Sequence, residues 1–244
     1  MKAGKVRKKV LALLLAGTAI LGLTGGGTMQ VEAAGQENAY VDTSSYEQLY
    51  KLYEDYFKLG IACQAMDHWN DPTAEIGNQE KEELINRMFN SMTFGNELKP
   101  AYNFDASSEN LFKVDFAAEE MLEWAKENNM KVRGHVLVWH SQVDPSIFAI
   151  DYQAYADGKL TKSDTAKLDE ECLVDREELL ARLKRYIYGV LEYTYKNGYA
   201  DVIYAWDVVN EAADENQYDG LRRSYWYQII GCLLYTSDAA DDLI

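Results

Sequence analysis

The feature that most constrains the fold is the regular alternation of short apolar runs with amphipathic stretches along the chain. Four apolar runs have the length and composition of strands, at 59–65, 91–94, 131–140 and 202–209. Segments with helical spacing lie around and between them, at 46–58, 80–89, 115–129, 177–197 and 224–230. Strands that alternate with helices predict parallel strands joined by crossover helices. We therefore expect an α/β fold that begins near Tyr46 and contains about four βα units.

Two of the expected helices have recognisable ends. Asp115 precedes a helix in which Phe116 is expected to face inward. The helix at 177–197 is followed by Gly198, which suits the position just past a helix C-terminus. The stretch 143–175 is rich in Asp, Lys and Thr, and we expect one long irregular loop there that shapes the mouth of the fold.

The first 33 residues have the pattern of an export signal. A basic head comes first, formed by Lys2, Lys5, Arg7, Lys8 and Lys9. An apolar run at 10–23 follows, and Ala33 ends a stretch of small residues that suits signal-peptide cleavage. A membrane anchor is the alternative, but the run has 14 residues, whereas a membrane-spanning helix needs about 20. We predict a signal peptide at 1–33, a linker at 34–45, and a secreted, extracellular protein without membrane contact after cleavage.

The charge of the chain argues against nucleic acid and lipid partners. Residues 1–33 carry five positive charges and one negative charge, so their removal from a chain of net charge −16 leaves −20. A strongly acidic protein is repelled by phosphate backbones and by anionic lipid head groups. A neutral polymer is compatible with this charge.

The cysteines give no sign of a metal site. Cys63, Cys172 and Cys232 are an odd number, and they show neither CxxC spacing nor a histidine-rich neighbourhood. A disulfide between Cys63 and Cys172 is one alternative, and isolated thiols are the favoured one.

Polar side chains gather where three of the expected strands end. They are Asn96 and Lys99 after the second strand, His135, His140 and Gln142 on or after the third, and Asn210 and Glu211 after the fourth. In a parallel βα barrel the ends of all strands meet at one face, so these groups are expected to converge. Each also has a plain structural explanation, since Asn210 and Glu211 could cap a helix. His135 could be a core residue, and Lys99 a surface cation. Their occurrence together favours a functional site.

A carboxylate at a strand end beside tryptophans suggests acid catalysis on a sugar. Cleavage of a glycosidic bond needs a proton donor for the leaving oxygen and a second carboxylate for the oxocarbenium-like centre. Trp69, Trp139 and Trp206 offer aromatic faces for pyranose rings, although core packing is favoured for Trp206 because it lies in mid-strand.

Three segments resemble, in order and spacing, signature segments of glycoside hydrolase family 10, chiefly endo-β-1,4-xylanases. The segments are TFGNELKP at 93–100, VRGHVLVWHSQ at 132–142 and WDVVNEA at 206–212. The resemblance runs from about Tyr46 to Gly231. It implies a (β/α)8 TIM barrel, truncated after about four βα units, with 46–231 as the N-terminal portion of the catalytic barrel.

The resemblance implies retaining hydrolysis of xylan or xylo-oligosaccharides, with no cofactor and no metal. Glu211 matches the general acid/base, and Asn210 matches the residue that binds the 2-hydroxyl of the sugar at subsite −1. The residues that match the lining of the glycone subsites are Asn96, Lys99, His135, Trp139 and Gln142. Many members have Glu where this chain has Gly95. The resemblance therefore does not carry over the hydrogen bonds that this carboxylate makes at subsite −2.

The resemblance stops after Gly231. The segment 232–244 looks unlike the family, and we predict that it is a non-native tail. The nucleophile of the family lies in a Thr-Glu-Leu/Ile-Asp type motif on strand seven, and no such motif occurs in the chain. The chain alone is therefore expected to have little or no activity.

The sequence leaves two other functions open. An Asn-Glu pair after the fourth strand is shared more widely among related retaining barrel glycosidases. An enzyme of this kind that acts on cellulose or another β-glucan is therefore the alternative among enzymes. The alternative outside enzymes is a protein that binds xylan through the glycone subsites without cleaving it. A plain extracellular structural domain would leave the three segments unexplained.

Overall fold

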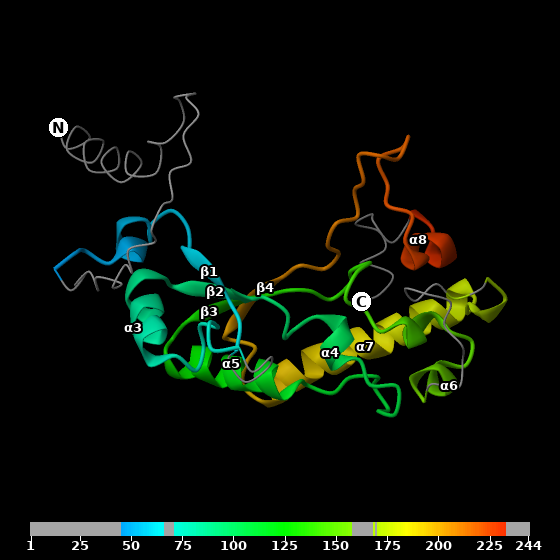
Figure 1. Cartoon of the computed structure of the whole chain (residues 1–244), viewed down its shortest axis with the longest axis horizontal. Coiled ribbons are helices and arrows are strands. Elements are labelled where there is room, and N and C mark those ends of the chain that lie inside the picture. Colours follow the sequence, from blue (N-terminus) through cyan, green and yellow to red (C-terminus); the bar gives the residue numbers. More distant parts are fainter. Residues whose placement is uncertain (1–44, 66–70, 158–167, 169, 233–244) are drawn as a thin grey trace, which may run out of the picture. The chain divides into compact units, whose positions relative to one another are not determined.

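The structure is a computed structural model that describes residues 45–65, 71–157, 168 and 170–232 (Figure 1). Apart from Ser45, these residues all belong to the second of two compact units, Met1–Ser45 and Tyr46–Ile244. The expected signal peptide, the linker up to residue 44, Trp69 and residues 233–244 lie outside the described residues. No described helix combines the length and the apolar composition that crossing a bilayer requires.

One sheet of four parallel strands forms the centre of the second unit, in the order β1-β2-β3-β4. The strands are β1 (Gly60–Cys63), β2 (Ser91–Phe94), β3 (Lys131–Gly134) and β4 (Ile203–Trp206). Each strand pairs with the next one along the chain, so that Met92 lies between Ile61 and Val132, and Val132 lies opposite Ile203. The prediction of an α/β fold with parallel strands is confirmed.

Three strands are shorter than expected, and the first of them, β1, spans Gly60–Cys63 rather than 59–65. β3 ends at Gly134 rather than at residue 140, and β4 ends at Trp206 rather than at residue 209. Beyond these ends a single parallel bridge joins Val138 to Val209. The two segments therefore stay side by side after the regular ladder has stopped, and they carry the polar residues that follow them to the same edge of the sheet.

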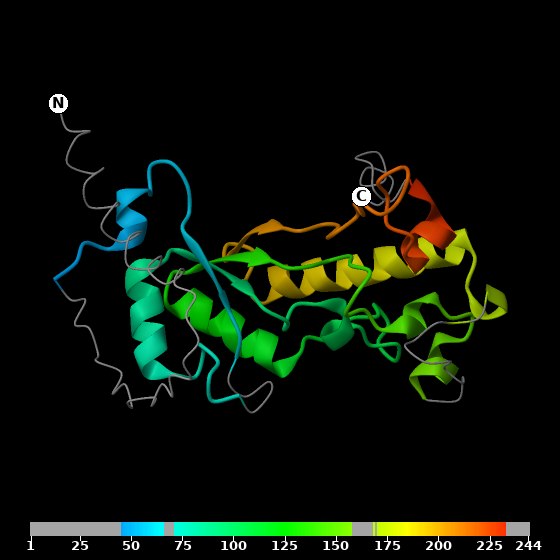
Figure 2. The same ribbon diagram turned by 45° about the horizontal axis from the view of Figure 1, so that its top comes forward.

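Four longer helices accompany the strands. They are α3 (Gln79–Met88), α5 (Phe116–Glu127), α7 (Arg176–Lys196) and α8 (Tyr225–Ile230), and their N-caps are Asn78, Asp115, Asp175 and Ser224. Each cap side chain accepts a hydrogen bond from a backbone N–H of the first turn, which fixes where the helix begins. After α7, Gly198 adopts φ 72°, a conformation that glycine reaches without steric cost. Figure 2 shows α3 and α5 along one side of the sheet.

Three expectations about local structure are wrong. The segment 46–58 forms only the short 3₁₀ helix η1 (Leu49–Leu52), because it has no buried face whose packing could stabilise an α-helix. Phe116 is 59% exposed at the first position of α5, and the buried face of that helix begins with Ala117. The expected irregular loop at 143–175 contains three short helices, η2 (Pro145–Phe148), α6 (Tyr152–Ala156) and η3 (Glu170–Cys172). A further short helix, α4 (Pro100–Asn103), follows β2.

The core has two parts. The first lies between the strands and the helices α3 and α5, and includes Met92, Phe94 and Val132. The second surrounds α7, and packs Leu183 and Tyr186 of that helix against η2 and α8.

Side chains of both parts contact Trp206, which confirms that this residue packs in the core. Its indole lies on Gly134, where an added Cβ would be 2.5 Å from the indole Cδ2 atom. Close packing at this point of the sheet therefore depends on glycine.

The three cysteines are free, so the alternative of a disulfide between Cys63 and Cys172 is wrong. Burial, followed by the nearby carboxylates of Glu75 and Glu97, raises the pKa of Cys63 to about 12. Because the thiolate is the reactive form, we expect Cys63 to resist a thiol reagent at pH 8, while the exposed Cys232 reacts. Titration with a chromogenic disulfide reagent, before and after unfolding in guanidinium, measures this difference. Rapid labelling of Cys63 in the native protein would contradict it.

Candidate functional site

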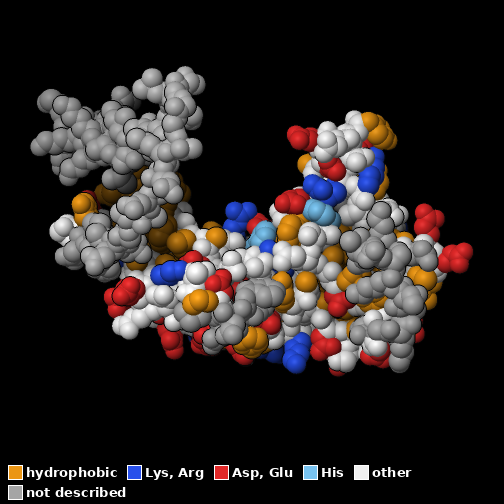
Figure 3. Space-filling model, viewed as in Figure 1, with side chains coloured by type: hydrophobic (Ala, Val, Ile, Leu, Met, Phe, Trp, Pro, Cys, Tyr) orange, Lys and Arg blue, Asp and Glu red, His pale blue; other side chains and the backbone are white. Residues whose placement is uncertain are grey.

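The predicted site residues all lie just beyond the C-terminal ends of the strands. Asn96 and Lys99 follow β2, His135, Trp139 and Gln142 follow β3, and Asn210 and Glu211 follow β4. Parallel strands bring these ends to one edge of the sheet. Figure 3 shows histidine side chains on one face of the molecule, each near basic side chains.

Three of the predicted residues form a closed hydrogen-bonded triangle. Lys99 Nζ donates to Asn96 Oδ1 at 3.0 Å and to Gln142 Oε1 at 2.6 Å, and Gln142 Nε2 donates to Asn96 Oδ1 at 2.9 Å. Gln142 also donates to the hydroxyl of Tyr102 at 3.2 Å, and its φ is 43°. Burial lowers the pKa of Lys99, and the carboxylates of Glu97 and Glu211 oppose this effect. The site thus contains a largely buried cation held by two amide oxygens.

Trp139 joins this triangle to the predicted acid. Its indole ring lies 4.9 Å from Lys99 Nζ, in a cation–π contact. Its Nε1 donates to Glu211 Oε2 at 3.0 Å. The backbone of Trp139 is fixed in turn, because Trp226 Nε1 donates to its carbonyl oxygen at 2.9 Å. Trp139 therefore orients one oxygen of Glu211.

Glu211 is exposed and has a constrained backbone. Its side chain is 49% exposed, and its φ is 51°, in the left-handed region that residues other than glycine seldom adopt. Arg222 Nε donates to the carbonyl oxygen of Glu211 at 2.8 Å and holds this part of the chain. The interpretation of Asn210 and Glu211 as helix caps is wrong, since the next described helix, α8, is capped by Ser224.

His140 lies beside Glu211. Its Nδ1 is 3.7 Å from Glu211 Oε2. Burial and the positive charge of Arg222 lower the pKa of His140, and Glu211 and Asp214 oppose this shift. The lowered pKa favours the uncharged form of the imidazole beside Glu211.

His135 is oriented by two residues that sequence reasoning missed. Its Nδ1 lies 2.9 Å from Asp207 Oδ2, and Arg133 Nε donates to Asp207 Oδ1 at 2.8 Å. The pairing of Nδ1 with the carboxylate leaves Nε2 as the nitrogen available to a ligand. Its ring lies 6.2 Å from that of Trp139, which connects it to the rest of the site. The sequence held a signal for Arg133, which lies two positions before His135, because side chains two positions apart in an extended segment share one face. It held no such local signal for Asp207.

Asn210 reaches the same edge but is not joined to the triangle. Its backbone N–H donates to the carbonyl oxygen of Val138 at 2.9 Å. Within residues 45–65, 71–157, 168 and 170–232, its side chain makes no hydrogen bond with the other predicted site residues. The structure therefore supports its place at this edge, and its amide is open to a ligand.

Glu97 is a third missed residue, and it has a structural part in the site. It is fully buried, and its carboxylate accepts from the backbone N–H groups of Ala65 at 3.0 Å and Asn96 at 2.9 Å. It thereby ties the segment after β1 to the segment after β2. The position of Asn96 depends on this buried carboxylate.

The arrangement suits an uncharged, hydroxyl-rich ligand. It combines amide groups, a buried ammonium, a neutral imidazole and an indole with one exposed carboxylate that can exchange a proton with the ligand. In the described part of the chain, no group of three or more His, Cys, Asp or Glu side chains could hold a metal ion.

Comparison with known proteins gives a consistent result. Residues 48–239 match the model of glycosyl hydrolase family 10. Endo-1,4-beta-xylanase A of Caldicellulosiruptor sp. (strain Rt8B.4) is 39% identical over 183 residues, which are 75% of this chain and 23% of that protein. A thermostable celloxylanase of Thermoclostridium stercorarium is 34% identical over 84% of this chain and 47% of its own length.

A solved structure agrees with these matches. An intracellular xylanase of Thermoanaerobacterium saccharolyticum JW/SL-YS485, in a mutant complex with xylotetraose, is similar with a TM-score of 0.57 and 30% identity. The similarity covers 77% of this chain and 49% of that one. The chain thus spans about half the length of this solved structure, and less than half of the two curated relatives.

Proposed function

Because the chain belongs to glycosyl hydrolase family 10, we propose that it is the N-terminal part of a retaining endo-β-1,4-xylanase with Glu211 as the general acid/base. One observation carries the proposal. Glu211 is an exposed carboxylate at the end of β4, oriented by Trp139, and Trp139 also contacts the buried Lys99. A proton donor and a set of groups for binding a neutral sugar therefore lie at the same edge of the sheet.

In the proposed mechanism, Glu211 first gives its proton to the glycosidic oxygen as the bond to the leaving sugar breaks. In the second step the same carboxylate removes a proton from the water that releases the bound sugar. The hydrogen bond from Trp139 holds one oxygen, and the other can face the substrate. Glu211 thus acts as acid and then as base.

The other predicted residues bind the sugar on the side away from the leaving group. Lys99, Asn96 and Gln142 hold hydroxyl groups of the glycone, and His135 offers Nε2 for the same purpose. Asn210 binds the 2-hydroxyl of the sugar whose bond is broken. A retaining enzyme also needs a second carboxylate as the nucleophile, and the Thr-Glu-Leu/Ile-Asp type motif expected to carry it does not occur in this chain.

We also propose that the protein is exported. The basic head and the apolar run of residues 1–33 support this, and so does a polymeric substrate that is too large to enter a cell. Mass spectrometry of protein from the culture medium of an expressing host tests it, with a new N-terminus near residue 34 expected. Retention of the intact leader in the cell would contradict the proposal.

The proposed substrate is tested by comparing β-1,4-xylan with a soluble β-1,4-glucan, using the complete protein that contains this chain. We expect faster release of reducing ends from xylan, and the celloxylanase among the relatives makes the glucan a necessary comparison. Proton NMR of the first products should show the β-anomer before mutarotation, because a retaining enzyme keeps the anomeric configuration. Faster cleavage of glucan would favour the β-glucanase alternative. Retention on insoluble xylan without cleavage would favour the binding protein.

A further inference from the structure

A side chain outside the predicted set completes the row of polar groups at the strand ends. Gln64 follows directly after β1, and its Oε1 accepts a hydrogen bond from Asn96 Nδ2 at 3.3 Å. Asn96 belongs to the triangle with Lys99 and Gln142. Hydrogen bonds therefore run without a break from the end of β1, through the end of β2, to the segment after β3.

The side chain of Gln64 occupies this position only because residue 95 is glycine. A Cβ placed on Gly95 would lie 2.7 Å from Gln64 Cγ and 3.2 Å from its Cδ. Real Cβ atoms do not approach a neighbour so closely, and Gly95 has no positive φ that would require glycine for backbone reasons. The glycine thus provides space, and Gln64 fills it.

The amide nitrogen of Gln64 is available to a ligand. Its backbone is held by the neighbouring segment, since Gln64 N donates to Glu75 Oε2 at 3.1 Å and Gln64 O accepts from Ile76 N at 3.0 Å. Its side chain is only half-buried. Among the residues that the structure describes, none accepts a hydrogen bond from Gln64 Nε2. A fixed donor that has no acceptor among the described residues is thus placed beside the triangle of Asn96, Lys99 and Gln142.

We propose that Gln64 binds a sugar unit farther from the cleaved bond than the unit held by Asn96 and Lys99, and so sets the preference for chain length. The inference rests on the proposed function. Gln64 follows β1 and Glu211 follows β4, at opposite ends of the strand order. Three strand spacings of about 4.8 Å separate the two strands by at most roughly 14 Å. A linear polymer across the strand ends would meet Gln64 last, and Nε2 would donate to a sugar hydroxyl or ring oxygen.

The test is the dependence of kcat/KM on substrate length in the complete protein, with xylotriose to xylohexaose as substrates. For Gln64→Ala we expect about a fivefold lower kcat/KM on the longer substrates, the loss of one neutral hydrogen bond, and less than a twofold change on the shortest substrate cleaved. Gln64→Glu keeps the acceptor for Asn96 and the shape of the side chain but removes the donor. It should show the same length-dependent loss without a change in melting temperature.

Two further variants sharpen the test. Gly95→Ala should displace Gln64 and reproduce its effect, although residue 95 offers no group of its own. Gln79→Ala is the matched control, because Gln79 is an exposed glutamine on α3 whose side chain, in the described part of the chain, donates to Glu83 at 3.1 Å and to no predicted site residue. An equal loss on all lengths, or a wild-type length profile in Gln64→Glu, would overturn the proposal while leaving the xylanase function intact. A wild-type protein that cleaves no xylan or xylo-oligosaccharide would overturn both.

Discussion

Replacing Glu211 by glutamine should lower kcat on xylan by about 10²–10⁴-fold in the complete protein, the usual contribution of a general acid/base. Glutamine keeps the size of the side chain and still accepts a hydrogen bond from Trp139, but it has no proton to give to the glycosidic oxygen. The initial rate of reducing-sugar release measures the effect. KM should change little, because the groups that hold the glycone remain in place.

The matched control for this substitution is Glu215→Gln. Glu215 is an exposed glutamate four residues farther along the chain, and it should tolerate the change with full activity. A second control separates acid catalysis from folding. On an aryl xyloside whose leaving group needs no protonation, Glu211→Gln should form the glycosyl-enzyme at a nearly normal rate and stall at the hydrolysis step. If Glu211→Gln and Glu215→Gln gave the same rate on xylan, Glu211 would not be the acid.

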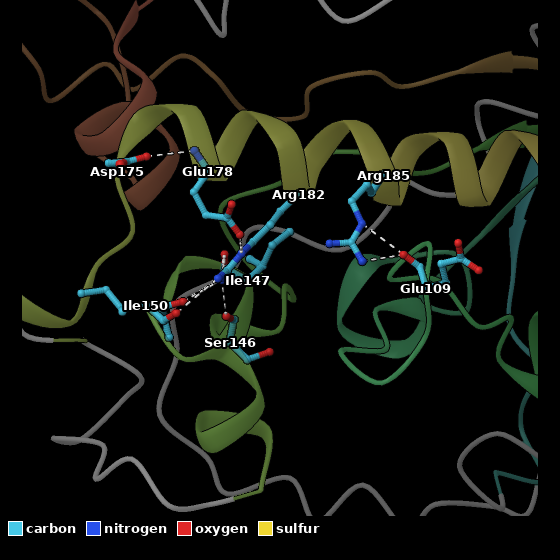
Figure 4. A network of polar contacts seen from close by, with 9 residues as sticks. Glu109, Ser146, Ile147, Ile150, Asp175, Glu178, Arg182 and Arg185 are labelled. Atoms are coloured by element: carbon cyan, nitrogen blue, oxygen red, sulfur yellow. Dashed lines mark hydrogen bonds and ion pairs between the residues drawn. The ribbon is translucent and has the colours of Figure 1, made fainter.

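Replacing Arg182 by methionine should lower the free energy of unfolding by about 2–4 kcal/mol, because buried carbonyl groups lose a charged donor. Arg182 is 3% exposed, and its NH1 group donates to the carbonyl oxygens of Ile147 at 3.0 Å and Ala149 at 2.6 Å. Its Nε donates to Glu178 at 2.7 Å. Figure 4 shows this network between α7 and the segment that contains η2. Methionine keeps the aliphatic bulk of the side chain, but it has no N–H group to donate to these acceptors.

The same helix offers the control. Arg185 lies three residues farther along α7, is exposed, and among the described residues donates to the carbonyl oxygen of Glu109, at 3.1 Å from Nε (Figure 4). Arg185→Met should cost less than about 0.5 kcal/mol, as is usual for a surface substitution. Urea unfolding followed by circular dichroism measures both variants, and comparable slopes would show that they unfold to similar states. Equal losses of stability would mean that burial of the guanidinium group does not matter here.

The predictions that succeeded depend on neighbours in sequence. The extent of α7 was predicted to within one residue at each end from a helical apolar pattern and a terminal glycine, and the structure adds the cap by Asp175. The shared position of Lys99, Gln142 and Glu211 followed from one additional premise, that parallel strands end at a common edge. The same local reasoning failed for 46–58, where apolar residues are present but none of the residues in η1 is buried.

The sequence by itself determined the alternation of strands and helices, the family segments and the residues at the strand ends, because these are local patterns of side chains. The tertiary structure decided which of those residues touch. Asp207 orients His135 across 72 positions, Trp139 holds Glu211 across another 72, and Gln64 reaches Asn96 across 32. Such contacts depend on how far each strand continues and on where glycine leaves space. Neither property can be predicted from a single segment, because both arise when separate segments pack together.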